Sequence, residues 1–149
     1  MYIKLNANKI VLLLATMMIC FVLTACAGLS DWDYELPNGY CVRHVNTENI
    51  ALIKEDGRYV IKRYVLEFCY SDSYIGIKRL PISDQTPYEE VLHIEEMDTS
   101  NPDYYLVDTV NDSVMGPYTA DKYVQQIQAL KIEDMCDWIK TVPKPEGAE

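Results

Sequence analysis

The sequence predicts an α+β fold, in which an antiparallel β-sheet built from hairpins is followed by a C-terminal helix that packs on one face. Three observations support this class. β-branched and aromatic residues concentrate between residues 40 and 118, the strong hairpin signal Asp56-Gly57 separates two such runs, and clear helical periodicity begins only after residue 119. Strands that come first and helices that come last favour an antiparallel sheet over parallel βαβ units.

The first 25 residues have the pattern of a secretion signal. Lys4 and Lys9 form a basic lead, and an apolar run over residues 10–23 follows it. The run has the length of a signal peptide and is shorter than the roughly 20 apolar residues that a spanning helix needs. The next motif, Leu23-Thr24-Ala25-Cys26, resembles the bacterial lipobox, in which the cysteine thiol is acylated and cleavage occurs just before it.

We therefore expect Cys26 to be the lipidated N-terminus of a mature protein at the extracytoplasmic side of a bacterial membrane. One acyl chain binds a bilayer only marginally, whereas the two or three chains of a lipoprotein cysteine, palmitate among them, hold it stably. Two alternatives stay open. Ordinary signal peptidase could act at Ala25-Cys26-Ala27 and release a soluble protein, or residues 10–27 could remain as an uncleaved membrane helix.

Residues 26–149 are long enough for one domain with its own core. We expect a tether over 26–37, a single α+β domain over 38–140, and a flexible tail over 141–149, which has two prolines and a glycine. Removing the signal takes away Lys4 and Lys9, which leaves 11 basic against 23 acidic side chains and a net charge of −12. This charge argues against nucleic acid as a partner, since phosphate binding needs a basic surface.

The expected strands alternate with turn signals. Asn38-Gly39 is a turn, and within the strand over 58–70 we expect Tyr64, Leu66, Phe68 and Tyr70 to face the core because they alternate with the residues between them. Asn111-Asp112 turns the last hairpin, and Gly116-Pro117 ends it. The expected strands are 40–45, 49–55, 58–70, 74–80, 104–109 and 113–115, while 88–97 fits either a strand or a helix.

A helix is expected to start at Thr119, which is a good N-cap, and Asp121 in its first turn suits the helix dipole. Tyr123, Ile127 and Leu130 recur at helical spacing and predict one apolar stripe. A second short helix is expected over 133–140.

The cysteines suggest one disulfide. If the strand over 40–45 pairs antiparallel with the distal half of 58–70, placing Cys41 opposite Cys69 also places Arg43 opposite Glu67. Exported proteins form such bridges, so we expect Cys41 and Cys69 to be bonded, with two free thiols as the alternative.

An acidic segment is the candidate partner surface. From residue 80 to 121 there is no lysine or arginine, while ten carboxylates occur. Such a segment is most often a solvated face, but it also suits capture of a basic protein or a divalent cation. The residues that we single out for this surface are Glu89, Glu90, Glu95, Glu96, Asp98 and Tyr104.

No motif predicts catalysis or a cofactor. Cys41-x-x-His44 has a spacing seen in zinc sites, but it is a single pair, and its two side chains would point to opposite faces of a strand. Residues 98–103 offer oxygens for calcium but lack the glycine and terminal glutamate of an EF-hand loop. We expect no catalytic, cofactor-binding or metal-binding residue.

Several short motifs together suggest a family. They are the lipobox, Asn38-Gly39-Tyr40, Tyr74-Ile75-Gly76-Ile77-Lys78, and the segment from Tyr104 to Thr109 that leads to Gly116-Pro117-Tyr118-Thr119. In these the chain resembles a family of small bacterial lipoproteins classed as domain of unknown function 3997. The resemblance covers nearly the whole mature chain and implies no catalytic residue, because none is assigned to that family.

These observations favour a non-enzymatic binding or accessory module of the cell envelope, with the membrane and a basic envelope protein as its partners. A small hydrolase acting on envelope material is the alternative from a different class, and a structural spacer is a third.

Overall fold

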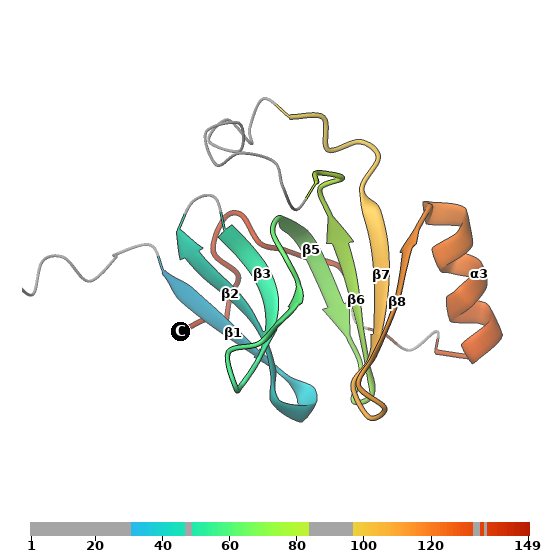
Figure 1. Cartoon of the computed structure of the whole chain (residues 1–149), viewed down its shortest axis with the longest axis horizontal. Coiled ribbons are helices and arrows are strands. Elements are labelled where there is room, and N and C mark those ends of the chain that lie inside the picture. The colour runs from blue at the N-terminus through green and yellow to red at the C-terminus, as the bar shows by residue number, and fades with distance from the viewer. Residues whose placement is uncertain (1–30, 47–48, 84–96, 133–134, 136) are drawn as a thin grey trace, which may run out of the picture.

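The computed structural model describes residues 31–46, 49–83, 97–132, 135 and 137–149. It shows two antiparallel sheets and a helix (Figure 1), where we predicted one sheet. The first sheet has the strand order β1-β2-β3-β4 and the second has the order β8-β7-β6-β5-β9. The elements are β1 Trp32–Leu36, the short 3₁₀ helix η1 Pro37–Gly39, β2 Tyr40–Asn46, β3 Asn49–Lys54, β4 Tyr59–Ile61, β5 Val65–Tyr70, β6 Tyr74–Arg79, β7 Asp103–Asp108, β8 Ser113–Tyr118, α3 Ala120–Leu130 and β9 Ile139–Lys140.

The main core is shared by the two sheets. Val42 and Leu52 of the first sheet belong to the same buried cluster as Phe68, Ile75 and Ile77 of the second, and all five are fully buried. Successive side chains of a strand point to opposite faces, so each strand gives about half of its residues to this core. Burial of one such side chain stabilises the fold by roughly 1.5–3 kcal/mol, which makes the shared cluster the main link between the sheets.

Helix α3 lies beside β7 and β8 (Figure 1). Its Tyr123 is buried in a second cluster with Leu106 of β7, whereas the neighbours of Leu106 along β7, Tyr105 and Val107, belong to the main core. The helix therefore covers the face of the second sheet that points away from the first. Thr119 caps the helix as predicted, because its Oγ1 accepts a hydrogen bond from the backbone N–H of Lys122 at 3.4 Å.

Residues 58–70 form two strands in different sheets, so the prediction of one long strand is wrong. β4 pairs with β3 in the first sheet, while β5 pairs with β6 in the second. The neighbouring residues Tyr64 and Val65 are both buried in the main core. One regular strand cannot point two successive side chains to the same side, so the chain changes direction between β4 and β5.

Residues 32–36 form β1, so the tether predicted over 26–37 is wrong for this part. Trp32 and Leu36 are buried and lie opposite His44 and Tyr40 of β2. The acidic side chains of β1 lie on the other face of the strand, where Asp33 pairs with Arg43.

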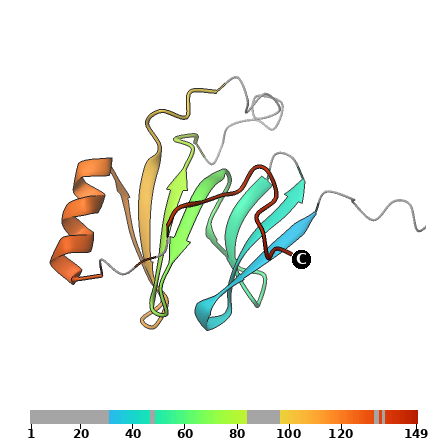
Figure 2. The same cartoon turned by 180° about the vertical axis from the view of Figure 1, so that it is seen from behind.

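The segment over residues 141–149, predicted to be a frayed tail, is packed along the fold, and we call it the C-terminal strap. The buried hydroxyl of Thr141 donates to the carbonyl oxygens of Val65 and Leu66, each at 2.9 Å. At its other end Glu149 exchanges two backbone hydrogen bonds with Asp33 of β1, at 2.8 and 2.9 Å. The strap therefore connects the two sheets, as Figure 2 shows from behind.

Two shorter predictions near the C-terminal end are also wrong. Ile139 and Lys140, expected in a second helix, form β9 and pair with Phe68 and Glu67 of β5. Gly116-Pro117 does not end the last hairpin strand, because β8 continues through it to Tyr118.

Candidate functional site

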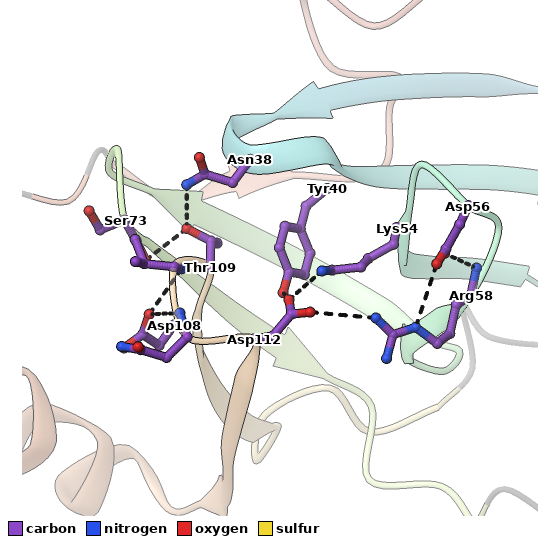
Figure 3. Close-up of polar contacts among 11 residues, drawn as sticks. Asn38, Tyr40, Lys54, Asp56, Arg58, Ser73, Asp108, Thr109 and Asp112 are labelled. Atoms are coloured by element: carbon purple, nitrogen blue, oxygen red, sulfur yellow. Dashed lines mark hydrogen bonds and ion pairs between the residues drawn. The ribbon is translucent and has the colours of Figure 1, made fainter.

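Turns from both sheets meet at one end of the molecule (Figure 3). They are η1, the β3–β4 hairpin, the turn between β5 and β6, and the turn between β7 and β8. We call this site the turn cluster. Its residues are Asn38, Tyr40, Lys54, Asp56, Arg58, Ser73, Asp108, Thr109 and Asp112.

Asp112 joins the two sheets within the turn cluster. Its Oδ1 accepts a hydrogen bond from the Tyr40 hydroxyl and contacts Nζ of Lys54, and its Oδ2 lies 3.6 Å from Nη2 of Arg58. Lys54 and then Tyr40 are the main causes that hold the pKa of Asp112 below its ordinary value, because both favour the charged carboxylate. Burial and the bond to Asp112 raise the pKa of Tyr40, which stays protonated and able to donate.

Asn38 and Thr109 form a second connection between the sheets. Nδ2 of Asn38 donates to Oγ1 of Thr109 at 2.7 Å and to the carbonyl of Asp72 at 3.0 Å. Oγ1 of Thr109 in turn donates to the carbonyl of Ser73 at 2.9 Å. The backbone of Asn38 has a φ of 60°, in the left-handed region that asparagine adopts more easily than most residues. The predicted turn at Asn38-Gly39 is thus confirmed. The side chain of Asn38 also bonds to the turn between β5 and β6 and to the turn between β7 and β8.

A cavity of about 380 Å³ opens within the turn cluster. It is lined by Asn38, Gly39, Lys54, Glu55 and Asp56. This volume is in the range of small-ligand sites. The lining offers two carboxylates, one ammonium group and an amide, so the cavity can recognise polar and charged groups through hydrogen bonds.

The predicted acidic surface is only partly visible. Glu89, Glu90, Glu95 and Glu96 lie outside the described residues, as does Cys26. Asp98 is exposed, and its carboxylate accepts a hydrogen bond from the backbone N–H of Ser100 at 2.9 Å. Tyr104 is half-buried and packs its ring against Tyr123 and Trp138, at 5.2 and 6.2 Å between ring centroids, so its main contacts lie on the helix side of the second sheet.

Cys41 and Cys69 lie in different sheets, so the register that we predicted for them is wrong. Cys41 lies opposite Glu35 and Ile53, and Cys69 lies opposite Gly76. The prediction depended on treating 58–70 as one strand beside 40–45. Burial, and to a lesser extent Asp33, raise the pKa of Cys41 to about 11, which makes this thiol a poor nucleophile near neutral pH.

Sequence reasoning found turns of this cluster but not the site. Asn38-Gly39, Asp56-Gly57 and Asn111-Asp112 were recognised as turns, yet no local signal places Asp112 against Tyr40, 72 positions away in the chain. Tyr40 had been interpreted only as a strand residue.

Within the described part of the chain, no three side chains of His, Cys, Asp or Glu form a group that could hold a metal ion. The described helices also include none that is long and apolar enough to cross a bilayer.

Comparison with known proteins identifies a family. A family model described as "Protein of unknown function (DUF3997)" matches residues 37–140. The matched range begins at η1 and ends at β9, so it contains the whole turn cluster and leaves out β1 and the C-terminal strap. No curated protein and no solved structure matches the chain.

Proposed function

Since this chain belongs to the DUF3997 family of proteins of unknown function, we propose its role from its own architecture. It is a lipid-anchored, non-enzymatic binding module of the bacterial envelope, and the turn cluster is the surface that it presents to a partner.

The position of β1 relative to Cys26 is the observation that carries this proposal. Every strand that the structure describes follows Cys26, and β1 begins at Trp32, six residues later. Six residues reach at most about 20 Å when fully extended. An acylated Cys26 therefore holds the domain close to the bilayer. β1 leads toward η1, so the turn cluster lies at the end of β1 opposite Trp32 (Figure 1). An anchor at Cys26 would thus leave the turn cluster on the side of the domain away from the lipid.

The turn cluster is suited to binding because it is held in one arrangement before a partner arrives. Turns carried by a rigid scaffold are common binding surfaces. Hydrogen bonds of Asn38 and Asp112 to the opposite sheet reduce the ordering that binding would otherwise require. Lys54 and Arg58 offset the negative charge of Asp112. Glu55 and Asp72 are further acids on this surface and are exposed. The surface therefore favours a basic partner.

The anchor is tested with two cysteine variants of the full chain. We expect Cys26→Ser to lose incorporation of labelled palmitate and to leave the membrane fraction or stay unprocessed. Cys20→Ser is the matched control, because Cys20 lies inside the predicted signal and should have no effect on either readout. Palmitate labelling that survives in Cys26→Ser would overturn the anchor.

The docking surface is tested by photocrosslinking in cells. A photoreactive residue at position 56, in the turn cluster, should form an adduct with a basic envelope protein, and the Glu55→Gln/Asp56→Asn variant should lose salt-sensitive binding of that protein. Position 121 on α3 is the matched control, because Asp121 is also an exposed acid. Adducts of equal yield at positions 56 and 121, or unchanged binding by the double variant, would contradict the assignment of this surface.

A further inference from the structure

A second cavity, of about 430 Å³, lies at the start of β1, at the other end of this strand from the turn cluster. Its lining carries more acidic than basic groups. The lining residues are Asp31, Trp32, Asp33, Glu35, Arg43, His44, Val45 and Glu149.

The acidic groups of this cavity are only partly neutralised. Arg43 binds Asp33 with both ends of its guanidinium, Nε to Oδ1 at 2.8 Å and Nη2 to Oδ2 at 2.7 Å. The positive charge of Arg43 and the negative charge of Asp33 thus cancel each other. Asp31, Glu35 and Glu149 are exposed, and among the described residues no cation other than Arg43 lines the cavity with them. Three carboxylates thus remain without a counter-charge in the described lining.

His44 provides an independent sign of a ligand. Only 7% of its surface is exposed, and its ring stacks on Trp32, with centroids 5.4 Å apart and planes 12° from parallel. Its Nδ1 is buried and has no hydrogen-bond partner among the residues that the structure describes. Buried polar atoms are nearly always paired, so an unpaired one beside a cavity calls for a group that fills the cavity.

We propose that this cavity binds a small organic cation of the ammonium or guanidinium class. Its N–H groups donate to Nδ1 of His44 and to the carboxylates of Glu35 and Glu149. Trp32 lines the same space. A volume of about 430 Å³ suits a small organic molecule. The site lies away from the turn cluster and does not depend on the docking proposed there.

The two tryptophans allow a test with a built-in control. Trp32 lines the cavity, whereas Trp138 packs against Tyr104 and Tyr123 on the helix side of the second sheet. The mature protein, labelled with ¹⁵N-tryptophan in non-ionic detergent, is titrated with the diamine cadaverine. We expect the indole resonance of Trp32 to shift in a saturable way and that of Trp138 to stay in place. The neutral analogue 1,5-pentanediol should shift neither, and the peptide Gly-Lys-Gly shows whether the cation is also accepted on a peptide.

Variants separate the contributions of Glu35 and His44 to cadaverine binding. Glu35→Gln should weaken cadaverine binding about 2- to 5-fold, the range expected for one exposed charge pair. Asp121→Asn on α3 removes the same charge far from the cavity and should leave the affinity unchanged. His44→Phe keeps a ring to stack on Trp32 but removes Nδ1, and it should weaken binding more than Glu35→Gln. If His44→Phe fails to fold, the comparison of Glu35→Gln with Asp121→Asn still decides.

Three results would overturn the proposal. The first is an equal shift of both tryptophans, and the second is an equal response to the diol. The third is a Trp32 shift produced by MgCl₂ while cadaverine produces none, because it would identify a metal site instead.

Discussion

Replacing Gly76 with alanine tests how α3 lies on the second sheet. A Cβ at this position would come within 2.2 Å of the Tyr123 hydroxyl oxygen and 2.7 Å of Sγ of Cys69. Ordinary contact between nonbonded heavy atoms is about 3.5–4.0 Å, so both neighbours would have to move. Gly76 is not among the glycines with positive φ, and the backbone itself would accept alanine. Without the neighbours, alanine would therefore stabilise the strand by roughly 0.5–1 kcal/mol.

The crowding reverses the sign of this effect. Overpacking a core costs about 1–3 kcal/mol, and since Cys69 and Tyr123 are both buried, we expect Gly76→Ala to lower the free energy of unfolding by about 2–3 kcal/mol. For a domain of this size that is a drop in Tm of about 10 °C. Urea denaturation followed by circular dichroism measures the difference directly.

A double-mutant cycle identifies the neighbour responsible. Tyr123→Phe removes the atom nearest to the added Cβ, so Gly76→Ala should cost at least about 1 kcal/mol less in that background. Gly57→Ala is the control, because Gly57 has a φ of +81° and no atom within 4 Å of its Cβ position. Its cost should be the same with and without Tyr123→Phe. The placement of α3 would be refuted if Gly76→Ala left the free energy of unfolding unchanged or raised it. It would also be refuted if Gly76→Ala lowered this free energy equally with and without Tyr123→Phe.

Three further predictions concern the turn cluster, the strap and a thiol. Because Lys54 is the main cause of the lowered pKa of Asp112, the stability that this carboxylate contributes is present above its unfolded pKa and is lost as the pH falls through its lower folded pKa. Asp112→Asn should therefore be less stable than the wild type in urea at neutral pH, and the difference should shrink as the pH falls through the lowered pKa of Asp112. Thr141→Val should cost about 1–2 kcal/mol in the same assay, because the carbonyl of Val65 loses its donor; no change would mean that the strap is not docked. Cys41, with a pKa raised to about 11, should be alkylated by iodoacetamide at neutral pH on the order of 100-fold more slowly than an ordinary thiol, and a rate like that of free cysteine would contradict its burial.

Local signals in the sequence predicted local structure well. Asp56-Gly57 lies between β3 and β4, and Thr119 begins α3, because each signal acts through its own neighbouring backbone. The same holds for β6 and β7, whose predicted bounds differ from the observed ones by a single residue at each affected end.

Features that depend on distant partners were missed. Thr141 precedes two prolines and has no strand pattern around it, yet it is buried because β5 offers it two carbonyls. The residues of β1 do alternate in strand fashion, but they follow the lipobox closely, and we predicted a tether at this position. No local signal marks the point after β4 where the chain passes from the first sheet to the second. The register from which we predicted the disulfide was wrong for the same reason.

The candidate sites show the same difference between local features and features that depend on distant residues. The chemistry of single residues was visible, as with the turn at Asn38, but the sites arise where segments far apart in the chain meet. Asp112 meets Tyr40, and Glu149 meets Asp33. Such contacts depend on the arrangement of the sheets and cannot be obtained from residue spacing.

Mass spectrometry of the N-terminal peptide of the mature protein tests the central claim most directly. The claim is that Cys26 is acylated and that the folded domain begins six residues later, at β1. We predict a peptide that begins at Cys26 and carries the mass of two or three acyl chains. An unmodified N-terminus at Ala27 or beyond, or a chain that retains residues 1–25, would contradict it.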